Sequence, residues 1–139
     1  MRIALFEPDI PQNTGTILRL CACLGVEAHL IEPAGFPISD RAFRRAGMDY
    51  LDQVAIVRHT SWPAFEQFLK HAGCRPVLFT TRASVSYLDH CFSAADVLLF
   101  GSNRPGFPKP CTRARTPGFA FPCGQACARS MWRWLAQWH

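Results

Sequence analysis

The residues best suited to chemistry lie near the amino terminus, in residues 7–25 (EPDIPQNTGTILRLCACLG). This stretch runs from an apolar strand through a proline-bounded turn into a helix, and Asn13 or Thr14 can cap that helix. Arg19 follows Gly15 by about one helical turn, so its guanidinium can point back toward the turn. Open α/β sheets bind ligands at such strand-end turns. The alternative is that Arg19 is an exposed arginine on an amphipathic helix.

Two further apolar segments end in residues that suit ligand binding. Thr80 and Thr81 follow the segment VLF, and Gly101 follows the segment DVLLF. Loops at the carboxyl ends of neighbouring parallel strands can converge on one ligand, and glycine allows close approach of the backbone. Each signal is weak alone, because threonine is common in strands and a glycine there can be a simple turn.

A cluster of arginines is predicted on a short helix over residues 40–47. Arg41, Arg44 and Arg45 fall within one and a half turns, and Arg58 follows the third predicted strand. Such clusters can bind the phosphates of a nucleic acid. An ordinary solvated helix face has the same composition, so this pattern leaves both interpretations open.

No metal or nucleotide motif is present. The sequence lacks GxGxxG, P-loop, HExxH and GxSxG patterns. Cys111, Cys123, Cys127 and His139 do not have the spacing of paired zinc ligands, so we expect no metal.

The elements that must position these residues alternate between strands and helices. Short apolar runs predict strands, and the intervening segments predict helices, one of them capped by Ser61. We therefore expect a single-domain α/β fold with a mostly parallel sheet. The predicted strands are residues 2–6, 28–32, 54–57, 77–80 and 96–100; a helix is predicted at 62–71, a turn at 49–53 and a loop at 84–87.

Composition narrows the class of protein. A length of 139 residues fits one domain. No apolar run is long enough to span a bilayer, and the amino terminus lacks the pattern of a signal peptide. The seven cysteines are then expected to be reduced thiols in a cytoplasmic protein.

The positive charge is confined to the carboxyl-terminal part of the chain. Residues 1–101 contain nine Lys and Arg against ten Asp and Glu, whereas residues 102–139 contain six Lys and Arg and no acid. Residues 102–139 also hold three of the four Trp, show no period-2 strand pattern, and are predicted helical only in their last ten residues. We therefore divide the chain into a domain of residues 1–101 and an aberrant basic tail of residues 102–139.

The segments EPDIPQNTGTILRLCACLG, LIEPAGFPISDRAFRRAGMDYLD and VLLFG resemble the SPOUT-class tRNA 2′-O-ribose methyltransferases that modify cytidine or uridine 34. The resemblance covers residues 1–101 almost continuously. It implies a parallel sheet with a trefoil knot, S-adenosylmethionine as the methyl donor, and a homodimer that binds tRNA across the subunit interface.

The resemblance also implies roles for individual residues. Arg19 is expected near the ribose 2′-hydroxyl, with Asn13 and Gly15 in the same motif. The positions expected to line the methyl-donor pocket are Phe79, Thr80 and Gly101, and those expected to contact the tRNA include Arg41, Arg44 and Arg45.

The sequence departs from the family after Gly101. The family continues with a Gly-rich loop, an R-I-P strand and an S-x-N helix start, and none occurs here. Codons for PGFAFPCGQACARS permit PGLRIPMRAGLRSI when read one nucleotide earlier, those for SMWRWLAQWH permit INVAVAGAMA, and those for NRPG permit ESAG once a base is restored near Ser102. We therefore expect residues from about Asn103 onward to be out of frame, with the knot-forming segment missing and little activity.

Two other functions fit the same residues. The chain could be a methyltransferase for a ribose in another RNA. It could instead be an inactive RNA-binding or dimerisation module that uses Arg41, Arg44 and Arg45.

Overall fold

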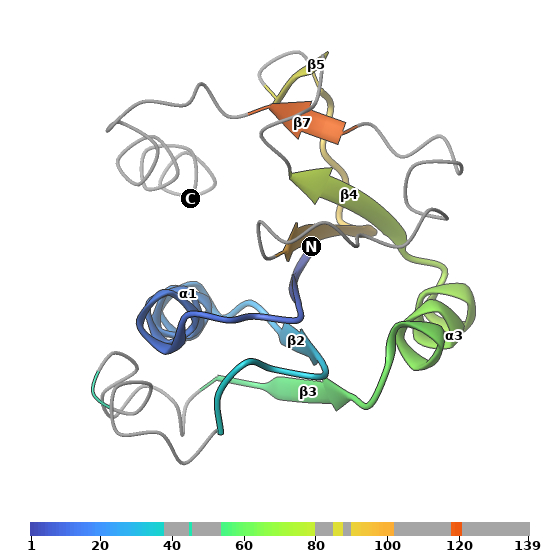
Figure 1. Cartoon of the computed structure of the whole chain (residues 1–139). Helices are drawn as coiled ribbons and strands as arrows, with labels where there is room; N and C mark the ends of the chain where they lie inside the picture. The colour runs from blue at the N-terminus through green and yellow to red at the C-terminus, as the bar shows by residue number, and fades with distance from the viewer. Residues whose placement is uncertain (38–44, 46–53, 80–84, 88–89, 102–117, 121–139) are drawn as a thin grey trace.

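The structure is a computed structural model, and it describes residues 1–37, 45, 54–79, 85–87, 90–101 and 118–120. These residues form one parallel sheet with a helix on each face (Figure 1). The strand order is β3-β2-β1-β6-β4-β7-β5, and every described pair is parallel. The strands are β1 (Arg2–Phe6), β2 (Ala28–Ile31), β3 (Ile56–His59), β4 (Arg75–Phe79), β5 (Val85–Ser86), β6 (Asp96–Gly101) and β7 (Gly118–Ala120).

Helix α1 (Pro11–Leu24) begins earlier than the sequence predicted. Ile10 is the N-cap residue, and no side chain caps the helix, so the prediction of a cap at Asn13 or Thr14 was wrong. Proline at the first position accounts for this start, because its fixed φ suits a helix and it has no N–H to satisfy. The helix ends at Gly25, whose φ of 62° is left-handed, as the sequence predicted.

Helix α3 (Trp62–Ala72) confirms the prediction made from Ser61. The Ser61 side chain accepts a hydrogen bond from the Ala64 N–H at 3.5 Å, and Pro63 lies in the first turn. The predicted helix over residues 40–47 and turn over residues 49–53 lie outside the described residues, except that Arg45 is helical and exposed.

β4 begins two residues earlier than predicted, at Arg75. Three other strands differ from prediction because long-range pairing determines them. β3 lies two residues later than predicted, since its register pairs His59 with Ile31 of β2. Val85–Ser86, predicted as a loop, forms β5, which pairs with β7. β7 itself lies in the segment where no strand was predicted, between β4 and β5.

Alternating residues of the strands build two apolar layers. In β1, Ile3 and Leu5 pack with Leu18 of α1, whereas Ala4 and Phe6 pack on the other face with the layer under α3. Because both faces of the sheet are covered, its central strands are apolar at nearly every position. The polar residues of β1 and β6 lie at their amino ends, Arg2 and Asp96, so polar groups at the other edge of the sheet come from the turns that follow the strands.

A buried histidine pair interrupts the layer under α3. His29 of β2 and His59 of β3 are 0% and 7% exposed, and His29 Nδ1 lies 2.9 Å from His59 Nε2. Phe65 and Phe68 of α3 pack against both rings. Burial lowers the pKa of His29 from 6.5 to about 4, opposed by Glu27, and burial also lowers the pKa of His59.

These pKa values predict a fold that loses stability in mild acid. Unfolded histidine binds a proton below about pH 6.5, whereas folded His29 does so only near pH 4. The free energy of unfolding should therefore be level above pH 6.5 and should fall by roughly 3 kcal/mol as the pH decreases to 4. Urea unfolding between pH 4 and pH 8 measures this change.

His29→Gln should remove most of that loss. His71→Gln, which changes an exposed histidine in the last turn of α3, should retain it. A loss of the same size in His29→Gln would contradict the assignment.

Candidate functional site

A cavity of about 130 Å³ lies where β1 and β6 end and α1 begins. The register pairs Phe6 of β1 with Gly101 of β6, so the two strands end at the same level of the sheet. Most of the wall is apolar, and Asp9, Asn13 and Thr14 provide its polar side chains. The lining residues are Leu5, Phe6, Pro8, Asp9, Ile10, Asn13, Thr14, Ile17, Phe100 and Gly101.

The structure brings together two of the residues predicted for the site. Asn13 and Gly101 both line the cavity, although they are far apart in the sequence. Gly15 is buried within α1, and Arg19, two turns into that helix, is half-buried; neither lines the cavity.

Phe79 lies at the end of β4, within a stack of aromatic rings. It is 8% exposed, and its ring centroid lies 5.0 Å from that of Phe100 and 6.3 Å from that of Phe92. Phe100 also lines the cavity, so Phe79 supports the wall from behind. The structure thus places the Phe79 side chain in the core.

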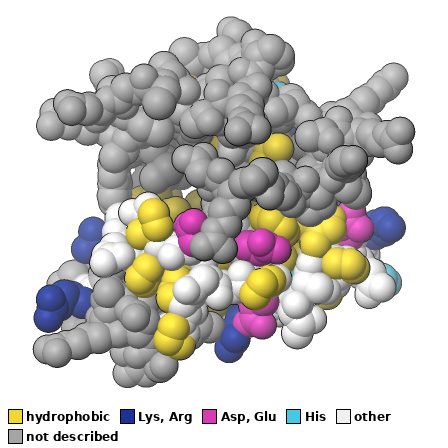
Figure 2. All heavy atoms as spheres, in the orientation of Figure 1, with side chains coloured by type: hydrophobic (Ala, Val, Ile, Leu, Met, Phe, Trp, Pro, Cys, Tyr) yellow, Lys and Arg dark blue, Asp and Glu magenta, His cyan; other side chains and the backbone are white. Residues whose placement is uncertain are grey.

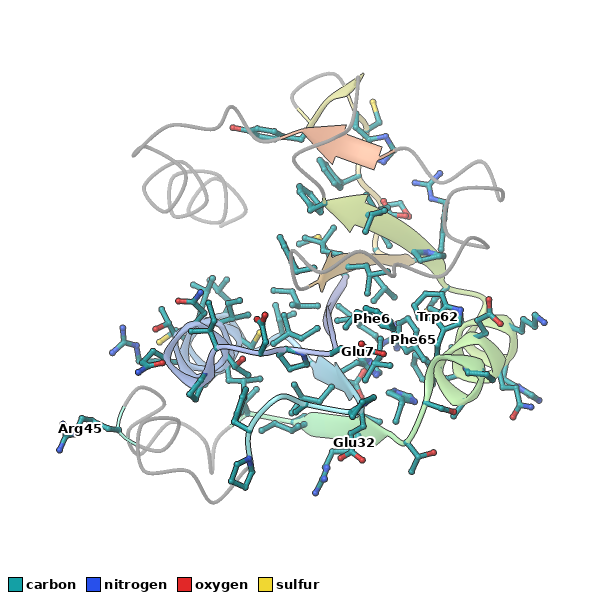
Figure 3. The ribbon with its side chains drawn as sticks, viewed as in Figure 1. Phe6, Glu7, Glu32, Arg45, Trp62 and Phe65 are labelled. Atoms are coloured by element: carbon teal, nitrogen blue, oxygen red, sulfur yellow. The ribbon has the colours of Figure 1, made fainter. Side chains whose placement is uncertain are left out.

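Four predicted residues remain, Thr80, Arg41, Arg44 and Arg45. Thr80, Arg41 and Arg44 lie outside the described residues. Arg45 is exposed and points away from the sheet (Figure 3). Their predicted roles stay predictions.

Sequence reasoning singled out the loop that leads from β1 into α1 but did not name Pro8, Asp9 and Ile10 as residues of the site. Ile10 is 48% exposed, which is unusual for a large apolar residue, and it lies on the cavity wall with Pro8 and Asp9. Glu7, just before them, has a φ of 43°. A position of this kind is sparsely populated by residues other than glycine, and such positions concentrate at functional sites.

Among the described residues that line the cavity, Asp9 is the one with a charged side chain. Figure 2 shows Asp and Glu side chains in the middle of the drawn face, among hydrophobic ones, with Lys and Arg side chains toward its edge. Glu32, after β2, pairs with the exposed Arg58. In the part of the chain that the structure describes, no group of three or more His, Cys, Asp and Glu could hold a metal ion.

The next two findings, on membrane-spanning helices and on cysteines, concern only the ranges of residues that the structure describes. No helix there is long and apolar enough to cross a membrane. Cys21, Cys23, Cys74 and Cys91 are free thiols, as expected, whereas Cys111, Cys123 and Cys127 lie outside those ranges.

The fold and the position of the cavity define the class of protein. A solved structure from work on the 2-OH methylation of C/U34 on tRNA is 34% identical, with a TM-score of 0.81 over 98% of this chain and 96% of that one. An AdoMet-bound rRNA methyltransferase from Sinorhizobium meliloti has the same fold, at 24% identity and a TM-score of 0.78, over 96% of this chain and 53% of that one. The chain therefore has the fold of RNA methyltransferases.

The sequence matches the SpoU rRNA Methylase family over residues 1–122, and the chain belongs to this family. A relative from Beijerinckia indica, named tRNA (cytidine(34)-2'-O)-methyltransferase, is 61% identical over 107 residues, covering 77% of this chain and 67% of the relative. A relative of the same name from Ancylobacter novellus is 47% identical over 131 residues, covering 94% and 82%.

We expect Thr14 to stabilise the first turn of α1 by a side-chain hydrogen bond. Its hydroxyl donates to the Ile10 carbonyl at 3.0 Å, and its side chain is 2% exposed. Thr14→Val should reduce the free energy of unfolding by about 1 kcal/mol, because a partly buried hydrogen bond is lost without a change of shape.

Thr16→Val is the matched control. Thr16 donates the same kind of bond to Gln12 at 2.9 Å, but this bond is exposed to water. We expect its loss to cost less than about 0.5 kcal/mol. Equal losses in urea unfolding of the two variants would show that Thr14 has no special role in this turn.

Proposed function

We propose that this protein transfers a methyl group from S-adenosylmethionine to the ribose 2′-hydroxyl of nucleotide 34, cytidine or uridine, in tRNA. The observation that carries the proposal is the cavity in which Asn13, from the first motif, faces Gly101, from the end of β6. The relative from Beijerinckia indica supports the choice of cytidine 34, and the structure from work on C/U34 supports both nucleotides.

The described residues fit part of the proposed methyl donor. The Phe100 ring offers an aromatic wall, and an aromatic face attracts a cation such as a sulfonium. Gly101, with no side chain, lets a ligand approach the end of β6. The volume of 130 Å³ is below the range of about 300–1,000 Å³ for sites that enclose a whole ligand, so we expect Thr80 and neighbouring residues to contribute too.

The chemistry required of the protein is modest. S-adenosylmethionine supplies, when bound, a methyl group that is already activated. The protein must hold the ribose hydroxyl in line and stabilise the negative charge that develops on its oxygen. The Asn13 amide can both donate to and accept from a hydroxyl, which suits it to orientation.

Arg19 is the residue proposed for charge stabilisation. A guanidinium carries a fixed positive charge and N–H donors, so it can stabilise an oxyanion but is a poor base. Its place on α1, two turns beyond the start of the helix, is compatible with a side chain that reaches back toward the cavity.

The proposed setting follows from the substrate. A tRNA-modifying enzyme is expected in the cytoplasm, where tRNA is used. We also propose a homodimer with tRNA bound across the interface, with Arg41, Arg44 and Arg45 on the RNA-binding surface. The family resemblance supports these proposals.

The decisive assay is transfer of a labelled methyl group to tRNA, with the modified ribose mapped to its position. We expect label at nucleotide 34 and none at other riboses. No transfer by this chain, together with no transfer by the chain with the missing base restored near Ser102, would overturn the proposal. Label at a different ribose would assign the enzyme to another RNA site.

Asn13→Ala should separate catalysis from folding. Asn13 is exposed in the first turn of α1, and alanine favours helix, so stability should be retained. We expect kcat/KM to fall at least about tenfold, which corresponds to roughly 1.4 kcal/mol of transition-state stabilisation. Gln12→Ala is the matched control, because Gln12 is an exposed neighbour that does not line the cavity, and it should stay within about twofold of wild type.

We further propose that the chain consists of a methyltransferase domain at residues 1–101 and a tail, residues 102–139, that is read out of frame from about Asn103. The absence of acids from the tail supports this proposal. β7 is compatible with both readings, because PGFAFP in the present frame and PGLRIP in the shifted frame both place apolar residues between two prolines. The family match to residue 122 includes this strand.

The frame proposal predicts a difference in cofactor affinity. A chain with the missing base restored near Ser102 should bind S-adenosylmethionine at least about tenfold more tightly than the present chain, because the resemblance assigns part of the pocket to the restored segment. Calorimetric titration of the two chains measures the ratio, and equal affinity would refute the proposal. The nucleotide sequence of the gene, read on both strands, tests the frame directly.

A further inference from the structure

The loop between β1 and α1 follows a path that its own residues do not favour. Glu7 has a φ of 43°, although it is not glycine and it precedes Pro8, a position that normally favours extended backbone. Such a conformation persists only where the surrounding contacts impose it. The contacts that impose this path come from β2 and from the chain segment that follows it.

Two backbone hydrogen bonds hold this loop. The Glu7 N–H donates to the Ile31 carbonyl at 2.9 Å, which continues the pairing of β1 with β2. The Gly35 N–H donates to the Pro8 carbonyl at 2.8 Å. Gly35 thus fastens the loop directly beyond the strained residue.

Gly35 also approaches the loop too closely for a side chain. A Cβ atom at this position would lie 3.0 Å from the Asp9 Cα, 3.3 Å from the Asp9 Cβ and 3.6 Å from the Asp9 carbonyl oxygen. The nearest atom belongs to the backbone, so no rotation of a side chain can relieve the contact. A residue with a side chain here requires the backbone at Asp9 to move by a few tenths of an ångström.

The fastened loop is one wall of the cavity. Pro8, Asp9 and Ile10 line it together with Phe100 and Gly101 from the end of β6. The distance between the loop and the end of β6 therefore depends on where Gly35 holds the loop. In a methyl transfer, small errors in the placement of the hydroxyl reduce the rate severely.

We propose that Gly35 is a positioning residue for methyl transfer, which sets the wall formed by Pro8, Asp9 and Ile10 against the end of β6 so that the cavity accepts the target ribose. This inference rests on the proposed function and extends it to a residue that lies outside the cavity lining. Gly35 acts through the loop and need not touch the ligand.

The test compares Gly35→Ala with Gly73→Ala. Gly73 ends α3 with a φ of 61°, so alanine there strains the backbone, but Gly73 does not line the cavity. Both variants should have a lower Tm. Only Gly35→Ala should reduce kcat for tRNA methylation, by about tenfold or more, with the Kd for S-adenosylmethionine within about twofold of wild type.

A double-mutant cycle with Asp9→Gly tests the contact itself. Removing the Asp9 side chain eliminates the 3.3 Å contact and makes the backbone at residue 9 more pliable. The effect of Gly35→Ala on kcat should therefore shrink from about tenfold to about threefold or less in the Asp9→Gly background. An equal effect in both backgrounds would overturn the proposal. If Gly35→Ala alone does not fold, the effect of this substitution is measured by comparing the Asp9→Gly chain with the chain that carries both Asp9→Gly and Gly35→Ala.

Amide NMR spectra separate this inference from the proposed function. Gly35→Ala should shift the backbone signals of residues 9, 10, 13 and 14, and Gly73→Ala should not. If neither this chain nor the chain with the base restored near Ser102 transfers a methyl group to tRNA but these shifts occur, the proposed function fails while the contact between Gly35 and the cavity wall stands. Unchanged signals together with an unchanged kcat in Gly35→Ala would overturn the positioning role.

Discussion

Parallel hydrogen bonding between β1 and β6 is the constraint on which the site depends. Ile3 pairs with Leu98 and Phe6 with Gly101, so two segments from opposite parts of the chain end side by side. Because both faces of this sheet are covered by apolar layers, the polar groups of β1 and β6 lie at the strand ends and in the turns that follow them. The cavity forms there because α1 starts beside the last residues of β6.

Patterns of neighbouring residues in the sequence were sufficient to predict the central strands of the sheet and the ends of two helices. Short apolar runs located β1, β2 and β6, and Ser61 and Gly25 marked helix ends, because the physics of these elements is contained in a few neighbouring residues. β3, β5 and β7 were shifted or missed, because they are short and their positions depend on strands far away in the sequence. No local pattern contains that information.

The candidate site shows the same division. The convergence of Asn13 and Gly101 could be predicted, because loops at the carboxyl ends of parallel strands meet at one edge of the sheet. The path of the loop after Glu7 could not be predicted, because glutamate carries no signal for a left-handed φ and Gly35 reads as an ordinary turn glycine. The contribution of Glu7 and Gly35 to the site follows from the contact between Gly35 and Asp9, which only the structure shows.

The position of β6 between β1 and β4 has a consequence for synthesis of the chain on the ribosome. Leu98 is translated 95 residues after Ile3, its partner, which takes roughly 5 to 20 s at ordinary elongation rates. During this interval β1 can pair with β2, but its other edge lacks a partner, and unpaired apolar edges promote association between chains. The nascent protein therefore passes through a period in which a chaperone that covers this edge would increase the yield of folded molecules.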